Sequence, residues 1–190
     1  MHLTADDHKR LSAALAAAAT RTRARFELVS VHVSDRYALF PLVYGAVAGL
    51  TALGAQALFW PALPLRTGFF VAVVVFAAVA FLLDWLPLRL LSVPRRIKHV
   101  HARDMAHRAF AARVLAQPDR KPGVVFFVSL GERYVEIVTD RDVHQRVPQP
   151  AWDAIVADFA RAAKEGRVAD GLLAATDACT KVLAEHYPAT

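Results

Sequence analysis

The sequence predicts an α/β domain that is interrupted by a pair of membrane-spanning helices. Residues 38–91 are almost entirely apolar and form two runs of helical length. Segments rich in β-branched residues, with apolar side chains at every second position, lie on both sides of this stretch. Amphipathic helical patterns flank those segments, so the domain is expected to combine strands and helices from before and after the membrane insertion.

The apolar stretch is predicted to be a helical hairpin in a lipid bilayer. Its first run, residues 38–60, has no charged side chain and is long enough to cross a hydrocarbon core of roughly 30 Å. The second run, residues 69–83, becomes a span only if it continues past Asp84 through residues 85–88. A buried hairpin in a soluble core is the alternative, but such cores rarely contain two long uncharged runs in tandem.

The net charge of +6 is unevenly distributed around the two runs. Basic residues gather on the outer flanks, whereas the turn between the runs carries only Arg66. By the positive-inside rule, this pattern predicts a multi-pass protein of the cell inner membrane with both termini in the cytoplasm. Nucleic-acid binding, the other explanation for a basic chain, is not expected because no reading motif is present. The flanking basic residues are Arg21, Arg23, Arg25 and Arg36 before the hairpin and Arg89, Arg95, Arg96 and Lys98 after it.

The hairpin divides the predicted α/β domain into two parts. Residues 1–37 form the first part, residues 38–91 the hairpin, and residues 92–190 the second part. The chain has one cysteine, Cys179, so an internal disulfide framework is excluded. No apolar segment follows the first residues, so no cleavable signal peptide is expected.

The first part is predicted to contain one helix and one strand. Thr4 is expected to cap the helix, with Asp7 at the position that completes a capping box. Residues 26–33 alternate, with Val29 on one face and Phe26 on the other. A strand with apolar residues on both faces is typical of a central position in a sheet.

The second part is predicted to begin with a helix over residues 94–116. Two strands, residues 124–130 and 134–139, then form a tight antiparallel hairpin. A short connector precedes two further helices. These later elements are the connector at residues 143–147, a helix that begins after Pro148 and Pro150 and ends at Gly166, and a last helix capped by Asp170 and stopped by Pro188.

The strand pair carries a recognisable motif. Residues 128–133 read Val-Ser-Leu-Gly-Glu-Arg, and residues 135–143 read Val-Glu-Ile-Val-Thr-Asp-Arg-Asp-Val. This segment resembles the hairpin of the TPM-domain family, and the membrane helices after the first strand resemble its bacterial membrane-anchored branch. The resemblance implies a small mixed-sheet α/β sandwich. It also implies the activities described for some members, which are phosphatase activity and calcium binding; the membrane branch has no settled function.

Two positions depart from the family pattern. The family has an acidic residue in the Thr-x-Gly-Glu-Ile segment before its first strand, where this chain has Arg25. The glycine expected after Asp140 and Arg141 is Asp142. Both differences weaken the case for an inherited metal or catalytic site.

The acidic residues of the strand pair and the following loop are the candidate metal ligands. Asp140 and Asp142 lie close in sequence, and Glu136 can join them if its side chain reaches the loop. A hard cation such as Ca²⁺ requires several oxygen ligands at short spacing. Arg133 and Arg141 can neutralise the same carboxylates, so salt-bridged turns are the alternative.

Other chemically reactive groups do not form a convincing site. His101, Asp104 and His107 follow one another at intervals of three, whereas a helical zinc pair requires histidines four residues apart. Cys179 lies in the apolar stripe of the last helix and is expected to be an inert buried thiol. Ser129 lacks the glycine-flanked elbow of a serine hydrolase. No catalytic residue or dinucleotide-binding fingerprint is identified.

The sequence therefore favours a membrane-anchored binding or quality-control module that contacts another membrane protein. The alternative, based on the resemblance, is a metal-assisted, calcium-dependent phosphatase that uses Asp140, Asp142 and Glu136. A purely structural membrane subunit is a third hypothesis. The small residues Gly45 and Gly49 suit either helix dimerisation or packing within the hairpin.

Overall fold

The computed structural model describes residues 4–35 and 37–189, apart from the side chains at positions 86, 87 and 89. Arg36, one of the basic residues in the topology prediction, lies outside the described residues. The chain forms two compact units. One combines Met1–Ser34 with Val100–Thr190, and the other is Asp35–His99.

The first unit begins with helix α1 (Ala5–Arg21), which has the predicted capping box. The backbone N–H of Asp7 donates to the Thr4 hydroxyl at 3.2 Å. The Asp7 carboxylate in turn accepts from the backbone N–H of Thr4 at 2.9 Å. These reciprocal bonds satisfy two backbone groups that the first turn of a helix leaves unpaired, which fixes where α1 starts.

A three-stranded mixed sheet forms the centre of this unit. Its strands are β1 (Arg25–Val31), β2 (Gly123–Ser129) and β3 (Tyr134–Thr139), arranged in the order β1-β2-β3. β1 is parallel to β2, and β2 is antiparallel to β3. The prediction that the first strand is central is wrong. β2 is the central strand and is buried at every residue, whereas apolar residues on both faces of β1 reflect helices above and below the sheet.

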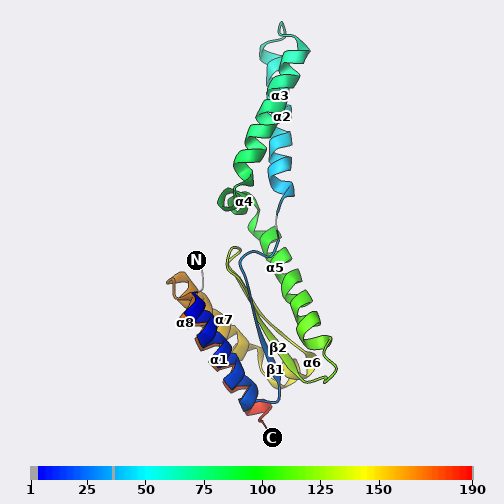
Figure 1. Ribbon diagram of the computed structural model, residues 1–190. Helices are drawn as coiled ribbons and strands as arrows, with labels where there is room; N and C mark the ends of the chain where they lie inside the picture. Colours follow the sequence, from blue (N-terminus) through cyan, green and yellow to red (C-terminus); the bar gives the residue numbers. More distant parts are fainter. Residues whose placement is uncertain (1–3, 36, 190) are drawn as a thin grey trace. The chain divides into compact units, whose positions relative to one another are not determined.

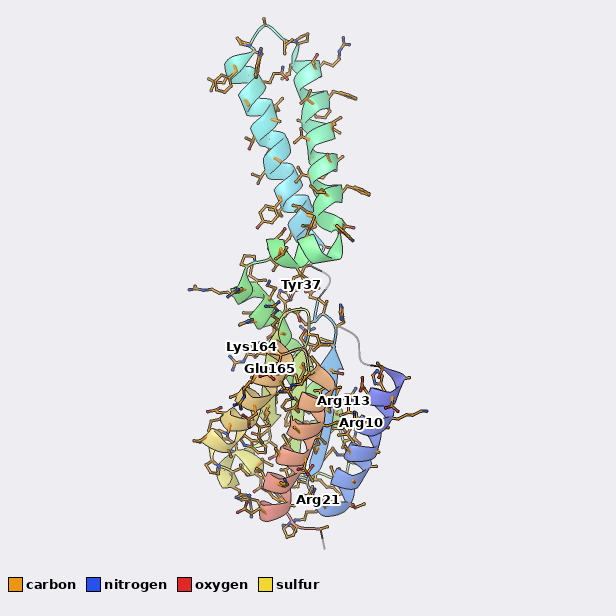
Figure 2. The ribbon with its side chains drawn as sticks, turned by 90° about the vertical axis from the view of Figure 1, so that its left-hand side faces the viewer. Arg10, Arg21, Tyr37, Arg113, Lys164 and Glu165 are labelled. Atoms are coloured by element: carbon orange, nitrogen blue, oxygen red, sulfur yellow. The ribbon has the colours of Figure 1, made fainter. Side chains whose placement is uncertain are left out.

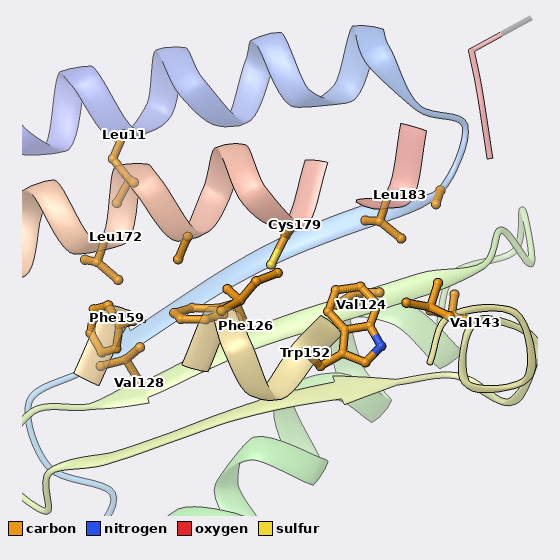
Figure 3. Packing of buried hydrophobic residues seen from close by; sticks show 14 of the residues in the cluster. Leu11, Val124, Phe126, Val128, Val143, Trp152, Phe159, Leu172, Cys179 and Leu183 are labelled. Carbon is orange, nitrogen blue, oxygen red and sulfur yellow. The ribbon is translucent and has the colours of Figure 1, made fainter. Parts of the chain in front are cut away.

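The two faces of the sheet contact different helices, as the alternation within the first strand predicts (Figure 1). Phe26 and Leu28 pack into a core shared with α1, α7 (Gln149–Lys164) and α8 (Val168–His186). Figure 3 shows how closely this core is filled around Phe126, Trp152 and Phe159. Val29 faces the other core, which is covered by helix α5 (Arg95–Phe110) and the π-helical turn Ala111–Leu115.

Two local predictions for the second part need correction. The expected connector at residues 143–147 is largely a short helix, α6 (Arg141–Arg146), because the Asp140 side chain caps it through the N–H of Val143. The last helix, α8, begins at Val168, so Asp170 lies in its first turn and does not cap it. An acidic residue is favourable both at the N-cap and in the first turn of a helix. The position of Asp170 alone therefore did not define where α8 begins.

The second unit contains the apolar helices α2 (Leu39–Phe59) and α3 (Leu65–Asp84), followed by α4 (Leu86–Ser92). The second run reaches full helical length by beginning earlier, at Leu65, and not by continuing past Asp84. α2 and α3 pack closely where a Cβ on Gly49 would lie 2.8 Å from the carbonyl oxygen of Ala72. Gly49 therefore allows the two helices of the hairpin to pack closely.

Candidate functional site

Asp140 joins the start of β2 to helix α6. Its Oδ2 accepts from the backbone N–H of Gly123 at 2.7 Å, and its Oδ1 accepts from the N–H of Val143 at 2.8 Å. The backbone N–H of Asp140 also donates to the carbonyl of Gly123 at 3.0 Å. Both carboxylate oxygens thus hold the local fold, which leaves fewer lone pairs for a cation.

Asp142 belongs to a second cluster, at the C-terminal end of the domain. Its carboxylate accepts from the Tyr187 hydroxyl at 2.7 Å and from Nε of Arg146 at 3.2 Å. The Tyr187 hydrogen bond and then the Arg146 contact lower the pKa of Asp142. The guanidinium groups of Arg23 and Arg146 lie 5.9 and 5.4 Å from the centre of the Tyr187 ring. This cluster therefore ties α6 to the end of the chain by charge and cation–π contacts.

Glu136 lies in a third environment, between β3 and α5. Its carboxylate accepts from the Tyr134 hydroxyl at 2.8 Å and lies 3.8 Å from Arg103 and 3.9 Å from His107. Burial, followed by the bond to Glu136, raises the pKa of Tyr134 above its ordinary value. The Glu136 side chain is therefore engaged with α5 and β3.

The three candidate metal ligands thus have separate partners. Within residues 4–35 and 37–189, no group of three or more His, Cys, Asp or Glu side chains is arranged to hold a metal ion. The site would need different side-chain orientations from those observed, so calcium binding stays a prediction. His101, Asp104 and His107 likewise form no such group.

Glu132, the glutamate of the Val-Ser-Leu-Gly-Glu-Arg motif, is a buried carboxylate in the turn after β2. It accepts from the Ser34 hydroxyl at 2.6 Å and from the backbone N–H of Ser34 at 2.8 Å. The Ser129 hydroxyl also donates to it. These contacts join the segments that follow β1 and β2. They could not be predicted without knowing that β1 and β2 are neighbours in the sheet. Ser129 is thereby engaged in a structural bond.

Cys179 is fully buried in the core between α8 and the sheet (Figure 3). Burial raises the pKa of this thiol to about 12. The thiolate, which is the reactive form, is therefore scarce at neutral pH. The expectation of an inert thiol agrees with this environment.

Two surface hollows lie along β1. The first, of about 400 Å³, is lined by the end of α1, the start of β1 and Lys121. The second, of about 420 Å³, lies between β1 and α5, with Val29, Val31 and Met105 among its lining residues. Basic side chains line both hollows, and the single carboxylate among the lining residues is Glu27. These basic residues are Arg23, Arg25 and Lys121 in the first hollow and His101, Arg108 and Arg113 in the second.

Comparison with known proteins identifies the family. A family model described as the TPM domain matches residues 88–182. No curated protein matches the chain. Among solved structures, the chain is similar to the NMR structure of the BA42 protein from the psychrophilic bacterium Bizionia argentinensis. That similarity has a TM-score of 0.59 at 14% sequence identity and covers 100% of this chain and 87% of BA42.

The similarity to BA42 concerns the fold, because 14% identity is too low to transfer an activity. The fold agrees with the mixed-sheet α/β sandwich expected from the sequence. The family match spans the strand pair that carries the Val-Ser-Leu-Gly-Glu-Arg motif and includes the candidate residues Glu136, Asp140 and Asp142. This chain belongs to the TPM-domain family.

Proposed function

We propose that this protein is a membrane-anchored TPM-domain module whose domain binds another protein at the inner membrane. The observation that carries the proposal is the outward placement of large apolar side chains on α2 and α3 (Figure 2). Phe81 is 84% exposed, and Leu58 is 75% exposed. Burying this surface in lipid is favourable, whereas leaving it in water would be costly.

The dimensions of the two helices support the anchor. α2 has 21 residues and α3 has 20, and the most apolar 18-residue stretches within them have mean hydropathies of 1.6 and 2.4. Each is long enough to span a hydrocarbon core. The basic residues on the outer flanks favour a cytoplasmic location for both termini, by the positive-inside rule. A bilayer around α2 and α3 would, with this orientation, leave the α/β domain on the cytoplasmic side.

The proposal that the domain binds a partner is based on its polar contacts. Asp140, Asp142 and Glu136 each support the local fold, and Cys179 is buried. The hollows along β1, by contrast, combine apolar and basic side chains at the surface. A surface of this composition suits recognition of a protein with complementary charge.

The anchor is tested by membrane flotation and by a reporter fused after the C-terminus. We expect the full chain to float with vesicles and the reporter to be active in the cytoplasm. Recovery in the soluble fraction would contradict the anchor, and periplasmic reporter activity would contradict the orientation.

Partner binding is tested in cells by a photo-crosslinking amino acid placed on exposed domain positions, one at a time. Ser30 on β1 and Ala157 on α7 are both exposed and sample different surfaces. Specific adducts at a set of neighbouring positions would support a binding module. The absence of adducts at every exposed position would overturn it.

Calcium provides the test of the alternative, a metal-dependent phosphatase. An ion that binds only the native state at about 100 times its Kd stabilises it by roughly 2.7 kcal/mol. A binding module without a metal site should unfold at the same temperature with and without millimolar calcium. A stabilisation that disappears in Asp140→Asn, with phosphatase activity that disappears in parallel, would favour the enzyme instead.

A further inference from the structure

β1 has one hydrogen-bonded edge and one free edge. Its pairing with β2 is set by the N–H of Arg25, which donates to Pro122 O at 2.7 Å, and by the carbonyl of Val31, which accepts from Leu130 N at 3.1 Å. In a parallel ladder, alternate residues direct both backbone groups to the same neighbour. Phe26, Leu28 and Ser30 therefore direct their N–H and C=O groups toward the opposite edge.

The second edge of β1 is not part of a ladder, although helix α1 contacts the strand. In the part of the chain that the structure describes, no other strand pairs with this side of β1. Ser30 is exposed, and Phe26 and Leu28 are only partly buried. Natural sheets normally blunt such an edge or use it to bind an extended segment.

The surroundings of the edge have a definite chemistry. The second hollow is lined by apolar side chains that include Val29, Val31 and Met105. Arg108 and Arg113 also line it, and Arg113 pairs with Glu27. The first hollow adds Arg23, together with Arg25 and Lys121, which both pair with Asp119. Basic side chains still outnumber acidic ones around the edge. An added strand would place alternate side chains over the two faces of the sheet, next to these hollows.

We infer that the free edge of β1 accepts an extended, acidic segment of a partner protein as an additional strand. The inference rests on the proposed function and names the surface and the chemistry of the partner. Backbone hydrogen bonds to Phe26, Leu28 and Ser30 would supply much of the affinity. The basic side chains would select a segment in which carboxylates accompany apolar residues.

A second copy of this chain is a poorer occupant of the same edge. Pairing two β1 strands would bring together two surfaces that each carry the same excess of basic side chains. Like charges at an interface weaken association and disfavour that pairing. The charge of the edge therefore points to an acidic partner.

A matched pair of variants at Ser30 tests the inference. Ser30→Pro removes an N–H that points away from β2, so it deletes an edge donor without breaking the existing ladder. Proline is tolerated at such positions on edge strands. Ser30→Ala removes the hydroxyl but keeps the N–H, and thermal unfolding of both variants would establish that each is folded.

The probe is a labelled peptide of about eight residues, close to the length of a typical strand, in which valine and glutamate alternate. Binding is followed by fluorescence anisotropy with the full chain in nanodiscs of neutral lipid. The peptide should bind the wild type and Ser30→Ala equally and Ser30→Pro about tenfold more weakly. A peptide with lysine in place of glutamate should bind at least about tenfold more weakly.

Equal binding by Ser30→Pro and Ser30→Ala would overturn the inference, and so would equal binding of the glutamate and lysine peptides. No binding of the glutamate peptide at about 1 mM would do the same. The proposed function is tested separately by cross-linking. Adducts at Ala157 but none at Ser30 would retain the binding module and remove its assignment to this edge.

Discussion

Helices in the two units bury opposite kinds of residue. α8 directs Leu172 and Leu183 into the core, where both are fully buried. α2 and α3 bury glycines such as Gly45 and Gly49 and expose their large apolar side chains instead. Burial of large side chains drives folding in water, whereas lipid already solvates them. The inversion supports the proposal that α2 and α3 lie in lipid.

The comparison is tested most strongly with two phenylalanines. Phe126 is fully buried and packs edge-to-face with Phe159 at a ring distance of 5.5 Å, whereas Phe81 is 84% exposed. Phe126→Ala should lower the free energy of unfolding of the domain by about 3–5 kcal/mol through the lost burial and the cavity. Phe81→Ala should leave it nearly unchanged. The free energies of unfolding of both variants are measured by urea unfolding, with labelling of Cys179 as the probe. Equal losses of stability in the two variants would contradict the comparison.

A charge placed in the middle of α3 tests the solvent of the hairpin. Val74 is 50% exposed. Val74→Arg should disfavour membrane insertion by about 2.5–3.5 kcal/mol, as measured for arginine at the centre of a spanning helix. The fraction of protein that floats with vesicles should fall, while the control Ala157→Arg on α7 should float like the wild type. Unchanged flotation of Val74→Arg would argue against a membrane-spanning α3.

Small residues inside the hairpin can be tested with two glycines of α2. A Cβ on Gly49 would meet the carbonyl of Ala72 at 2.8 Å, whereas a Cβ on Gly54 has nothing within 4 Å. Gly49→Ala should destabilise helix packing by about 1–3 kcal/mol. Gly54→Ala should stabilise the helix by up to about 1 kcal/mol. Titration with a denaturing detergent, followed by circular dichroism, compares them, and identical midpoints would contradict close packing at Gly49.

The smallest expected effect concerns a polar contact of the domain. Tyr187→Phe removes the hydrogen bond that contributes most to lowering the pKa of Asp142, so that pKa should rise toward its ordinary value. A lowered carboxyl pKa stabilises the fold above the unfolded-state pKa, and this contribution is lost as the pH falls through the folded-state pKa. The variant should therefore lose less stability on acidification.

Carbon-13 NMR titration of the Asp142 carboxyl measures this pKa directly. Tyr134→Phe is the matched control, because Tyr134 donates to Glu136 and not to Asp142. The control should leave the titration of Asp142 in place. An unchanged Asp142 titration in Tyr187→Phe would show that Arg146 and Arg23, and not Tyr187, lower the pKa of Asp142.

Much of the fold followed from periodicity and local capping. The Thr4 cap and the opposite faces of Phe26 and Val29 are local signals, and both predictions were correct. The position of β1 at the edge was missed because alternation reports which faces are covered and contains no information on strand order. The early start of α3 at Leu65 was missed because Arg66 and Gly68 interrupt the apolar pattern.

The candidate site was less accessible from sequence. Proximity in the chain suggested that Asp140, Asp142 and Glu136 act together, yet each forms contacts with a different part of the domain. The Tyr187 hydroxyl that binds Asp142 is distant in sequence, as is the backbone N–H of Ser34 that binds Glu132. Such contacts depend on how helices and strands are brought together, which no short motif specifies.

The pairing of β1 with β2 has a consequence for biosynthesis. Arg25 is paired with Gly123, so the first strand waits through the synthesis of both hairpin helices, about 5 to 20 s at ordinary elongation rates. If α2 and α3 span a bilayer as proposed and only one of them crossed it, the strands would emerge in different compartments and the sheet could not close. Completion of the domain would thus act as a quality check on membrane insertion, and misinserted chains would remain unfolded and open to proteolysis.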